Sequence, residues 1–372
     1  MAVEKQDNVQ FRILYFIGII LIVANHCGGG SISLVYEWFP AYSFHLALFV
    51  FASGYFFINN REKSIGKFIK KVILKFLVPL YVWNLIYGLI VLIVHQFGIE
   101  LGKNLSINTL LIMPIYNGHQ FVFNLASWFI FPLLVIQLLN IFAIKLIGKK
   151  DKLYYLHFII SLALGFLGVT LAINGYNKDF LLLLTRVLYF IPFFSLGLLY
   201  RTNLEKYDKC SNALYFAMLF TIALIFIYLV GGTKSYMPSW CTRFDNFYNP
   251  FIAGILGICF WLRISKVLVP SLKDSKIVQV ISKNTFSIMM HHLMGFFLLN
   301  TLWLALSKVF SFIEGFKYDS YKTDIYYRYL PNRLIQFNLL YVVVGIAFSL
   351  LVAYISKIIV QFIKNKITHK DV

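Results

Sequence analysis

Charged residues are scarce in this sequence. Only 13% of the 372 residues are Asp, Glu, Lys or Arg, whereas 60% are hydrophobic. A soluble protein carries about a quarter charged residues. Apolar runs of about 20 residues recur from end to end, the length that crosses a hydrocarbon core of about 30 Å. Because these runs are continuously apolar and do not alternate, they exclude a β-barrel. The composition therefore predicts an all-α integral membrane protein.

Acidic residues are scarcer still, with 15 Asp and Glu against 34 Lys and Arg, a formal net charge of +19. In a soluble protein this excess would suggest nucleic acid, but no basic face carries the interleaved aromatics that strand-binding proteins use. Instead, most of the basic residues gather in the N-terminal segment, in 58–76, 145–153, 201–211 and 263–284, and in the tail from Lys364. By the positive-inside rule these segments are cytoplasmic, beside anionic membrane lipids, and both termini lie inside.

Several chemical signatures are also missing. The sequence has no P-loop, Gly-x-Ser-x-Gly elbow or dinucleotide fingerprint. The spans hold almost no acidic residues and no histidine pair at i, i+4, so no metal is expected. The four cysteines lack metal-ligand spacing; Cys27 and Cys241 both fall in predicted outer loops, and unpaired thiols are favoured over a disulfide between them.

Ten candidate spans follow one another along the chain. They cover about 13–27, 38–58, 77–97, 122–144, 155–173, 181–200, 212–231, 248–264, 285–307 and 335–360. The first apolar run, Leu14 to Ala24, lacks a small-x-small cleavage site followed by a polar mature region, so it is a membrane helix and not a signal peptide. Because no segment between the spans is long enough to fold alone, residues 1–372 form a single membrane domain.

Two histidines are expected near the outer surface. His26 ends the first span, and His45 begins the second, which enters the membrane from outside. Ionisable groups in membrane helices are costly and are therefore functional candidates. A neutral imidazole suits a general base near neutral pH, so the pair predicts a polar pocket. Ser53 and Gly54, deeper on the same helix, favour close helix packing over chemistry.

Other polar residues leave two interpretations open. Arg186, about one turn below the outer surface, either stabilises an oxyanion or snorkels to the interface. Trp128 is either an interface anchor or a ligand contact. His291 and His292, about two turns from the cytoplasmic side, point about 100° apart, so at most one faces a given cavity, and a structural hydrogen bond is the alternative for each. No role is assigned to His95, His119, His157 and His369. From these residues alone an enzyme and a transporter fit equally.

Five stretches nevertheless resemble the acyltransferase-3 family of bacterial membrane O-acyltransferases. They are "ILYFIGIILIVANH", "FHLALFVFASGYFF", "KKVILKFLVPLYVWNLIY", "SWFIFPLL" with "RVLYFIPFFSLGLLYR", and "NTFSIMMHHLMGF". Each is weak alone, but their order and spacing together are specific. The resemblance implies an acyl-CoA donor, usually acetyl-CoA, on the cytoplasmic side, a glycan or lipid-linked sugar hydroxyl as acceptor, and a bacterial cytoplasmic membrane location.

The resemblance also assigns residues. His26 matches the catalytic histidine of the family, with His45 and Arg186 as further catalytic candidates. Donor binding is assigned to Arg12, Tyr15, His292 and Trp128. The family has Arg or Lys where Tyr15 stands, and Arg12, one turn earlier on nearly the same helical face, is the candidate replacement. The runner-up function is a glycan exporter or flippase, in which the same residues line a path. An oligomer is compatible with either function.

Overall fold

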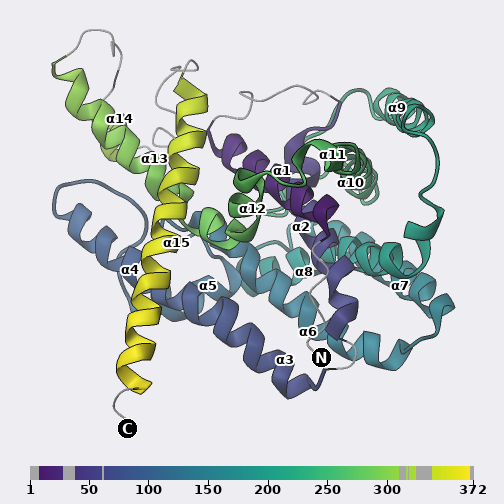
Figure 1. Ribbon diagram of the computed structural model, residues 1–372. Coiled ribbons are helices and arrows are strands. Elements are labelled where there is room, and N and C mark those ends of the chain that lie inside the picture. The colour runs from purple at the N-terminus through teal and green to yellow at the C-terminus, as the bar shows by residue number, and fades with distance from the viewer. Residues whose placement is uncertain are drawn as a thin grey trace.

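The computed structural model describes residues 8–27, 38–60, 63–309, 316, 318–323 and 337–368. These residues are mainly helical and contain no strand, only two isolated β-bridges. Ten helices of this described part of the chain are long and apolar enough to cross a membrane, which confirms the all-α multi-pass fold (Figure 1). The predicted outer segment 28–37, most of 308–334 and His369 lie outside the described residues.

The helices follow in this order. They are α1 (Val9–His26), α2 (Ala41–Phe57), α3 (Ile65–Val72), α4 (Val78–His95), α5 (Met113–Tyr116), α6 (Ile130–Ile147), α7 (Asp151–Ile173), α8 (Asp179–Leu199), α9 (Asn212–Leu229), α10 (Asn249–Val267), α11 (Val269–Leu272), α12 (Lys276–Lys283), α13 (Thr285–Ser307), α14 (Tyr318–Thr323) and α15 (Asn338–Thr368).

Two segments expected to be basic loops contain helices. Residues 65–72 form α3, which continues through a π-helical turn, Ile73–Leu77, into α4, so this span runs over 31 residues. Phe68 and Val72 of α3 are buried while its lysines are exposed. The amphipathic helix α12 likewise buries Val278 and Ile281. The density of basic residues predicted loops here, although the apolar residues between the lysines recur at the spacing of an amphipathic helix.

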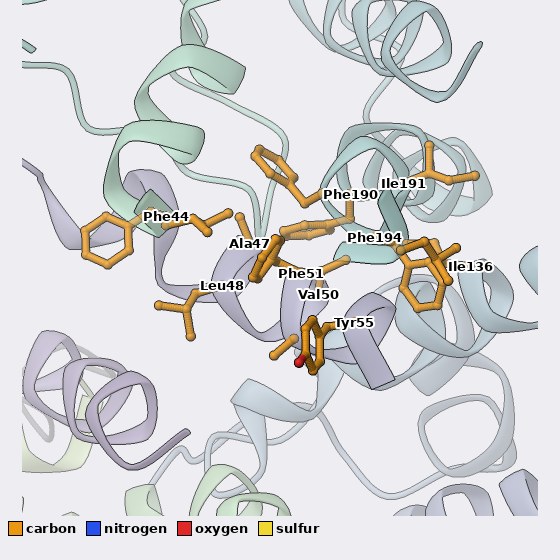
Figure 2. Close-up of a cluster of buried hydrophobic side chains, with 14 of the residues drawn as sticks. Phe44, Ala47, Leu48, Val50, Phe51, Tyr55, Ile136, Phe190, Ile191 and Phe194 are labelled. Carbon is orange, nitrogen blue, oxygen red and sulfur yellow. The ribbon is translucent and has the colours of Figure 1, made fainter. Parts of the chain in front are cut away.

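The core is built on the close contact between α2 and α8, with Phe44, Phe51, Phe190 and Phe194 gathered around it (Figure 2). Two glycines permit this contact. A Cβ on Gly54 would lie 2.0 Å from the carbonyl oxygen of Phe194, and a Cβ on Gly197 would lie 2.0 Å from that of Phe51. The packing role expected for Gly54 is therefore confirmed, and small residues bring membrane helices together here as expected.

Helix α1 contributes side chains to two separate apolar cores. It contacts α2, α10, α12, α13 and α15, and Figure 1 shows it in the middle of the view with α12 and α10 nearby. Its first half belongs to the aromatic core around α2, whereas Ile22, Val23 and Ala24 near its end join a second core formed by α4, α13 and α15. The end of α1 therefore lies where two cores meet.

The outer helices expose apolar side chains. Ile159 on α7, Ile225 on α9 and Ile355 on α15 are exposed, as are many of their neighbours. In Figure 1, α9 lies at the right of the view and α15 lies left of the centre. Exposed apolar surface of this extent is what membrane lipid covers at no cost, so these faces fit the lipid boundary of a multi-pass protein.

Candidate active site

His26 and His292 form a hydrogen-bonded pair. The Nδ1 atom of His26, the last residue of α1, lies 2.9 Å from Nε2 of His292 on α13, and the two rings stack with centroids 5.0 Å apart. His292 is fully buried, whereas His26 is partly exposed. The pair therefore has one enclosed member and one that can be reached by another molecule.

The surroundings of His292 fix where the protons lie. Nδ1 of His292 is 2.7 Å from the carbonyl oxygen of Ile288. A carbonyl only accepts, so this Nδ1 carries the hydrogen, and in the neutral ring Nε2 is then an acceptor. His26 must donate from Nδ1 to that Nε2, which leaves the lone pair on Nε2 of His26. By this hydrogen-bond network, His26 has the protonation state of a general base.

His291 forms its hydrogen bond with Tyr87 and not with His26. Its Nδ1 lies 2.6 Å from the hydroxyl of Tyr87 on α4, and the ring of Trp83 contacts it edge-on at 4.3 Å between centroids. The expected angular separation of His291 and His292 is therefore seen: one ring faces α1 and the other faces α4. Tyr87 had not been singled out from the sequence, although a tyrosine four residues after a tryptophan in an apolar helix marks one helical face.

His45 lies close to the end of α1 through Tyr42. The Tyr42 hydroxyl donates to the carbonyl of Asn25 at 3.1 Å, and its ring packs edge-on against His45 with centroids 5.4 Å apart. The buried His45 ring donates from Nδ1 to the Ala41 carbonyl. Neutral His45 then has an acceptor at Nε2 and no donor left for an oxyanion. The structure thus brings His45 near His26, but the neutral His45 ring cannot stabilise an oxyanion by a hydrogen bond.

Arg186 lies in neither of the two environments expected for it. It is buried, 1% exposed, so it does not snorkel. Its Nε and Nη2 donate to the Ser239 carbonyl, Nη1 donates to the carbonyls of Tyr116 and Asn117, each at 3.0 Å, and Nη2 also lies 3.5 Å from Nδ1 of His119. These five contacts account for all five N–H groups of a guanidinium. Arg186 therefore has no donor left for an oxyanion and instead joins two loops.

Aromatic rings complete the surroundings of Arg186. The Trp128 ring lies 4.5 Å from the guanidinium carbon, and His119 stacks on Trp240 at 4.0 Å. Burial, and then the nearby Arg186 charge, lower the pKa of His119, which keeps its ring neutral and able to accept from Arg186. Trp128 is buried, so it is a cation–π partner of Arg186 and not the interface anchor that the sequence also allowed.

The residues assigned to the donor lie far apart. Arg12 contacts the carbonyl of Lys273, just before α12, and is fourteen positions before His26, roughly 21 Å along the helix. Tyr15 packs its ring on Phe49 of α2 at 5.6 Å. The structure brings His292 to His26, so of the residues assigned to the donor His292 lies with the histidines, while Arg12 lies at the other end of α1.

The contact between His26 and His292 corrects the expected depths. The sequence placed His26 near the outer surface and His292 about two turns from the cytoplasmic side, yet the two rings touch. Helix α12, expected as loop, packs on α1 and precedes α13 directly. We attribute the difference to α12, because a helix along α1 carries the start of α13 toward the His26 end.

Comparison with known families gives one match. The model of a family described as an acyltransferase domain matches residues 10–358. No curated protein and no solved structure matches the chain. Within the described part of the chain, no group of three or more His, Cys, Asp and Glu side chains is arranged to hold a metal ion, and all four cysteines are free thiols.

Proposed function

Because this chain belongs to the acyltransferase-3 family, and is thus a multi-pass membrane acyltransferase, we propose that it moves an acetyl group from acetyl-CoA to a hydroxyl of a cell-surface or lipid-linked glycan. The observation that carries the mechanism is the His26–His292 hydrogen bond. It leaves the Nε2 lone pair of a partly exposed His26 as the base for the acceptor hydroxyl.

The proposed reaction is a direct acyl transfer. Nε2 of His26 takes the proton from the acceptor hydroxyl as its oxygen attacks the thioester carbonyl. The C–O ester bond forms, the C–S bond breaks, and the proton passes to the departing thiolate of coenzyme A. The hydrogen bond to His292 stabilises the imidazolium that forms in between, as the orienting partner of a catalytic histidine does. Nδ1 of His26 stays bound throughout.

The two ends of α1 suit an extended donor. Coenzyme A carries its thioester at the end of a long flexible arm, so its charged nucleotide end and its reactive end are far apart. Arg12 and His26 are separated by roughly 21 Å along one helix. In the orientation proposed from the charge distribution, Arg12 faces the cytoplasm, where acyl-CoA is found, and the membrane is the bacterial cytoplasmic membrane.

The proposal is tested with labelled acetyl-CoA. Wild-type and His26→Ala protein are reconstituted in vesicles with a host envelope glycan fraction, and label in the glycan is measured. We expect transfer by the wild type and a loss of about 100-fold or more in the variant, the scale of general-base catalysis. Equal labelling by both would remove His26 as the base. Glycan crossing the membrane without label would favour the exporter function.

A further inference from the structure

A set of buried, uncharged polar side chains lies on α4 and in the segment that precedes α6. Asn84 on α4 and the loop residues Gln120 and Asn124 are each 0% exposed, and Ser127 is 2% exposed. We call these four residues the amide cluster. Uncharged polar side chains buried this deeply in a membrane domain normally have all their hydrogen-bonding atoms paired, because unpaired ones are costly.

Asn84 fixes the orientation of the whole cluster. Its Nδ2 donates to the carbonyls of Thr109, at 3.1 Å, and Leu110, at 2.8 Å. Its Oδ1 is therefore the acceptor for Nε2 of Gln120 at 2.6 Å and Nδ2 of Asn124 at 3.3 Å. Because Gln120 and Asn124 must both present nitrogen to Asn84, the side-chain oxygens of both point away from it.

Those outward atoms have no partner among the described residues. Oε1 of Gln120, Oδ1 of Asn124 and Oγ of Ser127 are buried and unbonded there. Two amide oxygens only accept, while a hydroxyl also donates. The atoms therefore match a ligand that presents several hydrogen-bond donors, and the hydroxyl groups of a polyol have this chemistry.

The amide cluster is linked to the proposed base through a chain of neighbouring residues, and to a cavity through the backbone of Gln120. Asn84 is one helical turn from Tyr87, which bonds His291, the neighbour of His292. On the other side, the backbone N–H of Lys103 donates to the carbonyl of Gln120 at 2.9 Å. Lys103 belongs to a polar cavity of about 570 Å³, lined by His95, Gly98, Glu100, Gly102, Lys103 and Asn104. This volume is within the range of small-molecule sites.

We propose that the amide cluster binds hydroxyl groups of the acyl acceptor and that the cavity around Lys103 is where this polyol enters. The inference rests on the proposed function, since it names the binding site of that function's acceptor. The amide N–H groups of the coenzyme A arm offer the same donor chemistry, so the experiment measures acceptor and donor separately.

The test compares Ser127→Ala and Asn124→Leu with Ser195→Ala. Ser195 is the matched control, because it is a buried serine whose hydroxyl is already bonded, to Ser161 at 2.6 Å. We expect kcat/KM for the glycan fraction to fall about 3- to 10-fold in Ser127→Ala, the value of one neutral hydrogen bond, and further in Asn124→Leu. The KM for acetyl-CoA is expected to stay constant, and Ser195→Ala to leave both values unchanged.

A binding measurement separates this inference from the function. In detergent, the unlabelled glycan fraction should raise the unfolding temperature of wild-type protein and of inactive His26→Ala protein. The rise should be smaller for Ser127→Ala. If glycan stabilises the protein in this pattern and no label is transferred, the function fails and the site stands. If only the KM for acetyl-CoA rises, the amide cluster binds the donor and the proposal is overturned. The proposal is also overturned if glycan stabilises all variants equally or stabilises none of them.

Discussion

At the scale of single residues, the direction of one hydrogen bond decides the chemistry. Nδ1 of His292 donates to the Ile288 carbonyl, so Nε2 of His292 is the acceptor for Nδ1 of His26. A side chain whose acceptor atom replaces Nε2 of His292 should preserve the hydrogen bond from His26. We expect His292→Gln, whose amide oxygen can accept from Nδ1 of His26, to keep part of the activity, while His292→Phe lowers kcat about 100-fold with little change in KM. Steady-state kinetics with labelled acetyl-CoA measure both.

His291→Gln is the control for that pair. His291 is the adjacent buried histidine, but its partner is the Tyr87 hydroxyl and not His26. If His291→Gln and His292→Phe lower kcat equally, the effect comes from disturbing α13 and not from orienting the base. A full loss of activity in His292→Gln, with normal unfolding temperature, would also contradict the positioning role.

The sequence identified the residues better than their partners. It singled out His26, His45, Arg186 and His292, because polar groups in apolar helices are conspicuous. It did not predict that Arg186 is saturated, since its acceptors are backbone carbonyls of two loops distant in sequence. Asn84 is also a polar residue in an apolar helix, but an uncharged amide is a weaker signal in a membrane span than an ionisable group.

At the scale of elements, the contact between α2 and α8 depends on two glycines. A methyl group on Gly54 or Gly197 would overlap a backbone carbonyl, which cannot rotate away as a side chain can. We expect Gly54→Ala and Gly197→Ala each to destabilise the protein by about 1–3 kcal/mol through overpacking. Thermal unfolding in detergent measures this.

Gly66→Ala is the matched substitution for those two. Gly66 lies in α3 with no atom within 4 Å of an added Cβ, so alanine should be neutral or stabilise the helix by up to about 1 kcal/mol. Unchanged stability in Gly54→Ala would mean that α2 and α8 are farther apart than described here.

Arg186 connects the loop before α6 to the loop before α10. Arg186 bonds four acceptors, the carbonyls of Tyr116, Asn117 and Ser239 and the His119 ring, whereas lysine has three donors, so at least one acceptor loses its partner. We expect Arg186→Lys to lower stability by about 1–3 kcal/mol, the cost of one unsatisfied buried group. Proteolysis of the loop around Ser239 should also become faster.

Arg201→Lys provides the comparison for Arg186→Lys. Arg201 is 41% exposed and pairs with Glu205 at 2.9 Å, and such surface pairs contribute at most about 1 kcal/mol. If Arg186→Lys lowers stability as little as Arg201→Lys does, the hydrogen bonds of Arg186 do not hold the two loops in place. A direct role of Arg186 in the reaction then becomes the better explanation for a buried arginine at this position.

Hydropathy predicted the positions of the membrane-spanning helices well and their boundaries less well. The span 285–307 coincides with α13, and the span 212–231 is within two residues of α9. Helices α3 and α12 were assigned to basic loops, because charge density outweighed their apolar spacing. The packing of α12 against α1 and the contact of His292 with His26 are tertiary contacts, which hydropathy does not contain.

At the scale of the whole molecule, charge predicts which side faces the cytoplasm. The loop between α6 and α7 contains exposed Lys149 and should lie inside, whereas the loop between α7 and α8 contains exposed Tyr176 and should lie outside. This orientation places Arg12 on the side of acyl-CoA and the cavity around Lys103 on the side of a surface glycan. The proposed reaction depends on it, because donor and acceptor would then enter from opposite faces.

Single cysteines with an impermeant maleimide measure this orientation. The background carries Cys210→Ser and Cys259→Ser; Cys27 and Cys241 remain, because they are buried, and burial raises the pKa of the Cys241 thiol to about 11, which slows its reaction. We expect Tyr176→Cys to react in intact cells and Lys149→Cys only after lysis. The reverse pattern would place Arg12 and its end of α1 outside, away from cytoplasmic acyl-CoA, and the direct transfer through His26 would need a donor from the other face.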